Sequence, residues 1–377
     1  MDEQDLHTRL STVLPTVREH AVSVDADANF PKASIEALGA VGLLGLTLSP
    51  DVGGLGATPD QSATAVAAVA EGCGSTAMVY LMHLSAANVL AAATPTGHPD
   101  VLGELASGNK LSTLAFSEKG SRSHFWAPVS GLDEADGGLR LVAEKSWVTA
   151  ANRADVVVAS VRSVDAAGPM DCELYLVGGD DDGYVVTGGF DGLGLRGNDS
   201  APVDMSIAVD ERDRLGDASS GFGLMMQVVL PWFALGNAAV SIGLARAALN
   251  AAIAHVSEAR FAHLDSSIAD LPTVRAYIAK AWTALAAHEA LMRSTAQRMA
   301  APDDGTILAV LATKAGCNEM ALSVTETALR VAGGAAFSRH VGIDRPYRDA
   351  RAGFVMAPTS DALYEFAGRA LCGMELF

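Results

Sequence analysis

The sequence predicts an α+β protein in which a block of β-strands lies between two helical blocks. Up to residue 109, apolar residues recur at helical spacing, and Pro and Gly interrupt the segments. From 110 to 217, short β-branched runs alternate with Gly, Asp and Asn, which is typical of strands joined by turns. From 218 to 377, long alanine-rich helical segments return. The expected domains are therefore 1–109, 110–217 and 218–377, packed as one subunit because no linker separates them.

Local patterns predict the elements in chain order. In the first block, FPKASIEALGAVGLLGL and PDQSATAVAAVAEG have the apolar spacing of helices. The expected strands are KLSTLAFSE, LRLVAEKSWVTA, ADVVVASVRSV, CELYLVGG, GYVVTGG and VDMSIAVD. In the last block, Ala218–Ala245 has no charged residue and is long enough to span a bilayer. Its Gln227, Pro231, Asn237 and Ser241, with an amphipathic continuation, favour a buried bundle helix.

Charge and cysteine content restrict the function classes. The formal charge of -18 argues against nucleic acid or an anionic membrane as a partner. The cysteines stand far apart and form no Cys-x-x-Cys pair; they are Cys73, Cys172, Cys317 and Cys372. This spacing predicts a reducing, cytoplasmic protein without a metal site. The acidic start MDEQDLHTRL is unlike a secretory signal.

Two middle segments carry candidate chemistry, each with a structural alternative. EKSWVTAANRAD is expected to place Trp147 and Thr149 on one face of a strand, where they could bind a flat heterocycle. An ordinary half-buried strand is the alternative. AFSEKGSRSHFWAP contains a polar loop whose N–H groups and Arg122 could hold phosphate, or which is simply solvated. His124 in this loop can titrate near neutral pH.

A third segment, VAGGAAFSRHVGIDRPYRDAR, joins a glycine pair to a basic cluster. The pair permits close backbone approach. The cluster comprises Arg339, Arg345, Arg348 and Arg351. Asp344 and Asp349 are expected to neutralise part of it in salt bridges, and a purely structural ion-pair corner is the alternative. The chain has no dinucleotide fingerprint, P-loop or Gly-x-Ser-x-Gly elbow.

In this order, the segments resemble the acyl-CoA dehydrogenase family of flavoproteins over essentially the whole chain. ALGAVGLLGLTLSPDVGGLGAT is similar to the family's Gly-Leu followed by Pro-x-x-Gly-Gly-x-Gly. AFSEKGSRSHF stands where the family has Thr-Glu-Pro-Gly-Ala-Gly-Ser-Asp, and EKSWVTAANRAD matches Gly-x-Lys-x-Trp-Ile-Thr-Asn. RVAGGAAF and DRPYRDAR resemble Gln-x-x-Gly-Gly-x-Gly-Phe and Arg-Asp-Ala. Together these matches in register are specific.

The resemblance implies an acyl-CoA dehydrogenase-like fold with an N-terminal α-helical domain, a middle β-barrel-like domain and a C-terminal four-helix bundle. FAD would lie between the last two. The cofactor-binding residues implied by motif matching are Leu114, Phe116, Ser117, Ser123, Trp147, Val148, Thr149, Arg260, Gly333, Gly334, Thr359 and Asp361. Gly333 and Gly334 would approach the FAD of a neighbouring subunit, and Arg260 would reach the pyrophosphate. Sharing FAD in this way implies a homodimer or homotetramer.

The resemblance also exposes a missing carboxylate. Most members carry a catalytic Glu followed by Gly-Thr, whereas the matching residues here are Ala357, Pro358 and Thr359. Other members place the Glu on an earlier helix, where this chain has LPWFALG. The N–H of Ala357 could still hold a thioester oxygen. Arg330 replaces the family's Gln, and Arg260 is displaced within EARFAH.

Three functions fit this pattern. The first is α,β-oxidation of an acyl thioester with a base from elsewhere, for which His83 and His124 are candidates, although a structural role is the alternative for each. The second is a flavin-dependent monooxygenase on the same fold, supplied by a flavin reductase. The third is a base-less subunit of a mixed oligomer. Substrate chain length, carrier and electron acceptor are left open.

Overall fold

The computed structural model describes residues 1–122, 124–135 and 138–375. The first block is helical and comprises α1 (Glu3–Ala26), α2 (Lys32–Ala40), η1 (Leu43–Gly45), η2 (Pro50–Val52), α3 (Pro59–Gly72), α4 (Gly74–Ala92) and α5 (Val101–Ala106). The start of α3 follows directly from the sequence. Thr58 and Gln61 exchange capping hydrogen bonds, and Pro59 occupies the first turn, where its missing N–H costs nothing.

The middle block is a seven-stranded sheet. Its strands are β1 (Ser112–Ala115), β2 (Gly131–Ala135), β3 (Gly138–Val148), β4 (Val156–Arg162), β5 (Cys172–Gly178), β6 (Tyr184–Val186) and β7 (Ala201–Val209). The strand order is β1-β4-β2-β3-β7-β6, and β5 pairs with β4. β1 lies parallel to β4, whereas β3 is antiparallel to β2 and β7. β4 and β5 are almost wholly buried, which explains their mainly apolar sequences.

The last block begins with α6 (Gly221–Leu224), the π-helical η3 (Met225–Val229) and α7 (Leu230–Glu258). The short strands β8 (Arg260–Phe261) and β9 (Ser266–Ser267) and the turn η4 (Ile268–Asp270) lead to α8 (Pro272–Ala300). The chain continues through α9 (Thr306–Ala332), η5 (Gly333–Phe337), α10 (Asp344–Val355) and α11 (Ser360–Leu371). The expected order of helical, β and helical blocks is confirmed.

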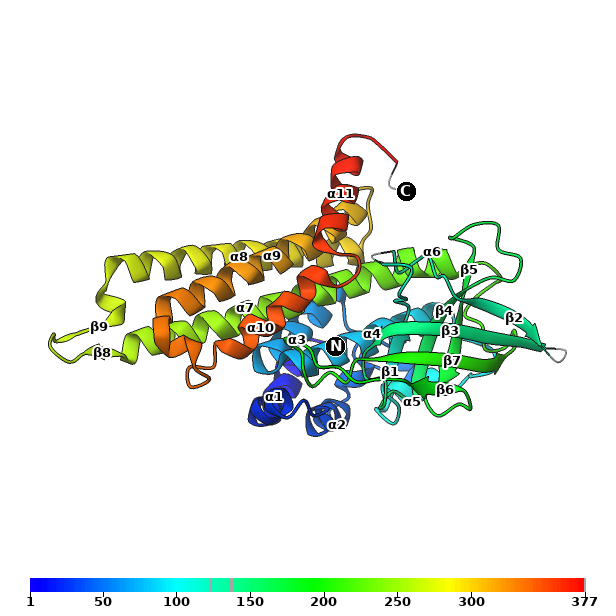
Figure 1. Ribbon diagram of the computed structural model, residues 1–377, viewed down its shortest axis with the longest axis horizontal. Helices are drawn as coiled ribbons and strands as arrows, with labels where there is room; N and C mark the ends of the chain where they lie inside the picture. The colour runs from blue at the N-terminus through cyan, green and yellow to red at the C-terminus, as the bar shows by residue number, and fades with distance from the viewer. Residues whose placement is uncertain (123, 136–137, 376–377) are drawn as a thin grey trace.

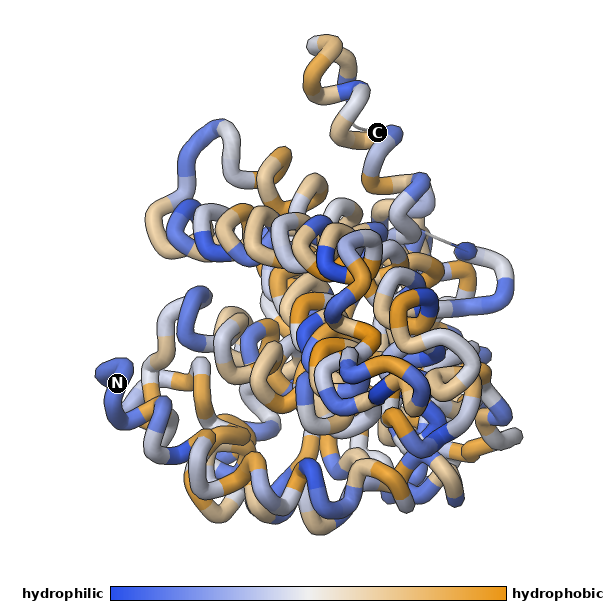
Figure 2. The backbone as a smooth tube through the Cα atoms, turned by 90° about the vertical axis from the view of Figure 1, so that its left-hand side faces the viewer, coloured by the Kyte–Doolittle hydropathy of each residue, from blue (hydrophilic) through white to orange (hydrophobic). Residues whose placement is uncertain are grey.

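The long helices lie side by side on one side of the molecule and the sheet lies on the other (Figure 1). α9 packs against α7, α8, α10 and α11. The turn between α10 and α11 lies between the long helices and the sheet, and α11 projects from the body in both Figure 1 and Figure 2. This arrangement places the turn that carries Ala357 at the border of two domains.

Three helical stretches are long and apolar enough to cross a membrane: Gly74–Ala92, Gly221–Glu258 and Thr306–Phe337. Within them, 78%, 83% and 56% of the most apolar window is buried in the protein. The apolar stretch 218–245 contributes to the second, as α6, η3 and most of α7, and its residues from Phe233 to Ala245 are buried. Packing inside the fold therefore accounts for its composition.

Candidate functional site

The turn between α10 and α11 is shaped by its own sequence. α10 ends at Val355, Met356 has extended backbone, and Pro358 disfavours helical backbone at Ala357. Thr359 caps α11, accepting a hydrogen bond from the Ala362 N–H, and Asp361 lies in its first turn. Ala357 is half-buried. The turn therefore presents a methyl group and backbone polar groups.

Beneath this turn lies Lys314, a residue that sequence reasoning missed. Its Nζ donates to Pro358 O at 2.8 Å and to Met356 O at 3.2 Å. Burial lowers the pKa of Lys314 to about 7. A signal existed in the sequence, because Lys314 falls on the apolar stripe of α9 with Val310, Cys317 and Ala321, all buried.

The first group of predicted flavin residues lies on β1, directly after β1, and on β3. The side chains of Leu114 and Phe116 are buried, and Phe116 stacks on Phe125 with ring centroids 6.2 Å apart. Ser117 is half-buried, and its carbonyl accepts a hydrogen bond from Ser146 N–H. Ser123 lies outside the described residues. This group joins the sheet to the loop that follows β1.

The expectation that Trp147 and Thr149 share one strand face is wrong. The pairing of β3 with β7 is irregular between Lys145 and Val148, and β3 ends at Val148. As a result, Trp147 is 61% exposed and Thr149, beyond the strand, is 5% exposed. A bulge changes the side-chain alternation, which a period-two pattern cannot anticipate. Trp147 still offers an open indole, with Phe190 at its edge.

The loop after β1 connects the sheet to α11 through aromatic rings. The exposed His124 contacts Trp126 edge-on, with ring centroids 5.2 Å apart. Trp126 is buried, and its ring lies 5.7 Å from that of Phe366 in α11. Two rings thus lead from His124 to the helix that begins directly after the Ala357 turn.

His83 is a structural residue, which corrects its candidacy as a base. It is fully buried in α4, where its Nδ1 accepts from Ser112 N–H at 3.0 Å and its Nε2 donates to Leu44 O at 2.9 Å. Burial lowers the pKa of His83 to about 4. Both ring nitrogens are occupied, so the imidazole joins two distant segments and is not available to a substrate.

A second group of predicted site residues lies at the opposite end of α7. Arg260 follows α7 and is exposed, whereas the sheet adjoins the other end of this helix (Figure 1). The 29 residues of α7 span about 44 Å. Gly333 and Gly334, at the end of α9, are exposed as well, and the φ of 61° at Gly333 is one that favours glycine. Within one chain, this group does not meet Trp147.

Two arginines of the basic cluster, Arg348 and Arg351, form ion pairs, in line with the structural interpretation of this segment. Arg348 pairs with Asp344 at 3.1 Å and with Asp25 of α1. Asp349 instead accepts from Leu195 N–H at 2.6 Å, and burial raises its pKa to about 6. The expected salt bridge is therefore confirmed for Asp344, while Asp349 holds a loop of the middle domain.

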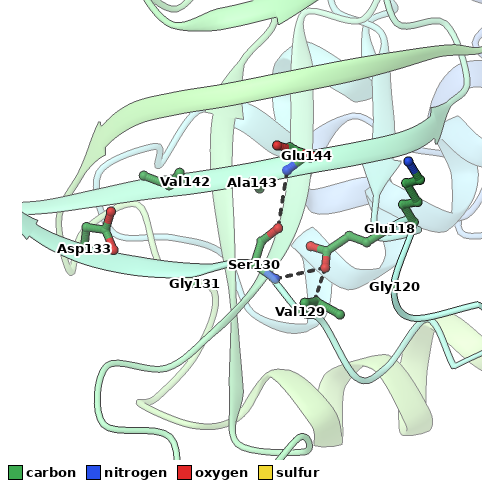
Figure 3. A pocket seen from close by; sticks show the side chains of 10 residues that line it. Glu118, Gly120, Val129, Ser130, Gly131, Asp133, Val142, Ala143 and Glu144 are labelled. Atoms are coloured by element: carbon green, nitrogen blue, oxygen red, sulfur yellow. Dashed lines mark hydrogen bonds between the residues drawn. The ribbon is translucent and has the colours of Figure 1, made fainter.

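A pocket of about 380 Å3 lies on the sheet. Glu118, Val129, Ser130 and Glu144 are among the residues that line it (Figure 3). The Glu118 carboxylate is already occupied: Lys145 Nζ lies 2.6 Å away, and the N–H groups of Val129 and Ser130 also donate to it. Their combined attraction keeps the pKa of Glu118 below its ordinary value despite burial. The Glu118 carboxylate in this pocket is therefore held in an ion pair and is not available as a base.

Comparisons with known proteins agree with this architecture. Models of the acyl-CoA dehydrogenase N-terminal and C-terminal domains match residues 11–109 and 219–371. The probable acyl-CoA dehydrogenase YngJ of Bacillus subtilis (strain 168) is 26% identical over 343 residues, which cover 89% of this chain and 88% of that protein.

Solved structures share the whole fold. Butyryl-CoA dehydrogenase from Megasphaera elsdenii superposes with a TM-score of 0.91 at 19% identity, over 99% of this chain and 100% of that one. The FAD complex of PigA superposes with a TM-score of 0.90 at 16% identity, over 99% of this chain and 98% of that one. On the match of both domain models, this chain belongs to the acyl-CoA dehydrogenase family of flavoenzymes.

Proposed function

We propose that this protein is an FAD-dependent oxidoreductase that introduces a double bond between Cα and Cβ of an acyl thioester, without a carboxylate at the α10–α11 turn. The observation that carries the proposal is the turn itself. Among the described residues, the Ala357 N–H has no hydrogen-bond acceptor, and the residue lies half-buried at the border of the helices and the sheet. A free donor fixed at a domain border suits an incoming carbonyl oxygen.

The residues present fit FAD. Trp147 exposes a flat ring beside the sheet, and the matched structure of PigA is an FAD complex. No side chain covers Gly333 or Gly334, and an added Cβ on either would meet nothing within 4 Å among the described residues. When bound, FAD supplies the hydride acceptor that no side chain can provide.

A second copy of the chain would bring the two groups of cofactor residues together. Gly333, Gly334 and Arg260 lie at the end of α7 remote from Trp147, so one flavin cannot touch both groups within one chain. α11 projects from the body and exposes Tyr364 and Leu371, which a partner could cover. A homodimer or homotetramer follows from the proposal.

His124 is the remaining candidate for the proton acceptor. The Ala357 N–H would stabilise negative charge on the thioester oxygen as the Cα proton leaves, but a positioned base must still take that proton. His124 is exposed and is connected to α11 by Trp126 and Phe366. His83 has no free nitrogen for the task.

The test is the rate at which acyl-CoA bleaches FAD-loaded protein without oxygen. His124→Gln should slow bleaching by roughly 10²–10⁴-fold, and adding Ala357→Glu should restore part of the rate by returning a carboxylate to the turn. An unchanged bleaching rate in His124→Gln would show that His124 is not the proton acceptor. Oxygen uptake that depends on a flavin reductase would indicate the monooxygenase, and a stoichiometric partner bearing the Glu would indicate the base-less subunit.

A further inference from the structure

Lys314 fixes the backbone on both sides of Ala357. Besides its bonds to Met356 O and Pro358 O, its Nζ lies 3.4 Å from Gly353 O, in the last turn of α10. An ammonium group has three N–H donors, one for each of these carbonyls. A single side chain on α9 thus holds the end of α10 and the entry to α11 together.

The same contacts leave the Ala357 N–H free. If α10 continued, that N–H would donate to Gly353 O, four residues earlier. Asn318 Nδ2 occupies this oxygen at 2.8 Å, with Lys314 beside it. The carbonyl that would otherwise accept the Ala357 donor is therefore taken by side chains from α9.

Stability alone does not favour a lysine at this position. Among the described residues, no carboxylate pairs with Lys314, and the Phe233 ring lies 5.9 Å from its Nζ. Burying an amine without a counter-charge costs free energy that an apolar side chain would not. The hydrogen bonds of Lys314 go to the end of α10 and to the turn.

We propose that Lys314 is a positioning residue that aims the Ala357 N–H at the carbonyl oxygen of a bound acyl thioester. The identity of the ligand rests on the proposed function, whereas the ordering of the turn by Lys314 does not. Lys314 touches neither substrate nor flavin in this scheme. It acts through the three carbonyls that set the position of the turn.

The first test needs no ligand. Lys314→Met keeps a long apolar side chain but removes the donors, and Val324→Ala is the control because it truncates a buried residue of α9 about 15 Å along the helix. Hydrogen exchange of the folded protein is followed by mass spectrometry. Exchange over residues 353–363 should accelerate at least tenfold in Lys314→Met and stay near the wild-type rate in Val324→Ala. Equal exchange in both variants would overturn the proposal.

The second test reads the hydrogen bond to the ligand. The probe is butyryl-CoA with a carbonyl carbon-13 label, and its carbonyl stretch is recorded by difference infrared spectroscopy on FAD-loaded protein. The wild type and Val324→Ala should lower the stretching frequency, and Lys314→Met should return it toward that of the free thioester. A frequency as low in Lys314→Met as in the wild type would overturn the aiming role. No shifted band in the wild type would count against the proposed function instead, and the exchange result would still decide whether Lys314 orders the turn.

Discussion

Two lysines among the described residues are buried almost completely, and they are stabilised in different ways. Lys145, on β3, has a carboxylate partner, Glu118, at 2.6 Å, and also donates to Ser160 O. Lys314, on α9, donates to backbone carbonyls and lies near an aromatic ring, and it has no carboxylate partner among the described residues. The first lysine joins the sheet to the loop after β1, and the second holds the turn between α10 and α11.

The comparison distinguishes a buried charge in an ion pair, at Lys145, from a buried amine that is held by backbone carbonyls, at Lys314. An ion pair with satisfied hydrogen bonds recovers much of the cost of burial, so Lys145 and Glu118 depend on each other. A lone amine recovers less and can lose its proton instead, which is the direction in which burial moves Lys314. The two sites should therefore respond differently to mutation and to pH.

The largest effect is expected for Lys145→Met. It leaves Glu118 buried without its counter-charge, so the apparent free energy of unfolding should fall by about 3–5 kcal/mol. Urea unfolding followed by circular dichroism measures the loss. The double variant Lys145→Met/Glu118→Met should recover much of it, and a double variant as unstable as the single one would show that the pair is not the cause.

His83 extends the comparison to a buried base that stays neutral. Its pKa is about 4 in the folded protein and 6.5 ordinarily, so the unfolded chain binds more protons between these values. The contribution of His83 to stability is complete above pH 6.5 and falls by about 3 kcal/mol as the pH drops to 4. In His83→Gln, the free energy of unfolding should not show this loss between pH 6.5 and pH 4. Identical pH profiles of His83→Gln and wild type would contradict it.

Lys314 should produce a pH effect at the alkaline end. Its pKa is about 7 in the folded protein against an ordinary 10.5, so the unfolded chain binds more protons in this range and the stability contributed by Lys314 rises with pH. The stability of the wild type relative to Lys314→Met should increase by about 2 kcal/mol over the first two pH units above neutrality. A constant difference, measured by urea unfolding at each pH, would mean that the amine stays charged.

The smallest effect is expected for Lys314→Met at neutral pH. Two carbonyls lose a donor, while Gly353 O keeps Asn318, and the cost of burying the amine disappears as well. The apparent free energy of unfolding should change by no more than about 1–2 kcal/mol. A loss as large as that of Lys145→Met would remove the distinction between the two lysines.

Local patterns were sufficient for the order of the blocks but not for every element. The helices and the apolar strands follow from periodicity and caps such as Thr58. β2 was missed because GLDEA has little β propensity, and its pairing with β3 creates the strand. The hairpin of β8 and β9 is too short to leave a pattern.

In the candidate site, too, local features could be predicted from the sequence, and roles that depend on distant residues could not. The sequence was sufficient to predict the turn at Ala357, because Pro358 and the helix cap Thr359 shape the backbone next to them. The role of His83 depends on Leu44 and Ser112, which are 39 and 29 residues away, and no local pattern reports such partners. The separation of Arg260 from Trp147 likewise depends on the length and direction of α7, which only the assembled fold reveals.

The most direct test of the Ala357 turn is to remove its N–H. Ala357→Pro does so, and the extended backbone of Met356, with φ of -67° and ψ of 135°, accepts a following proline. Ala357→Gly keeps the donor and serves as the control. In anaerobic mixtures of FAD-loaded protein with acyl-CoA, wild type and Ala357→Gly should bleach the flavin at similar rates, and Ala357→Pro should be roughly 10²–10³-fold slower. Bleaching of Ala357→Pro at the wild-type rate would contradict the account.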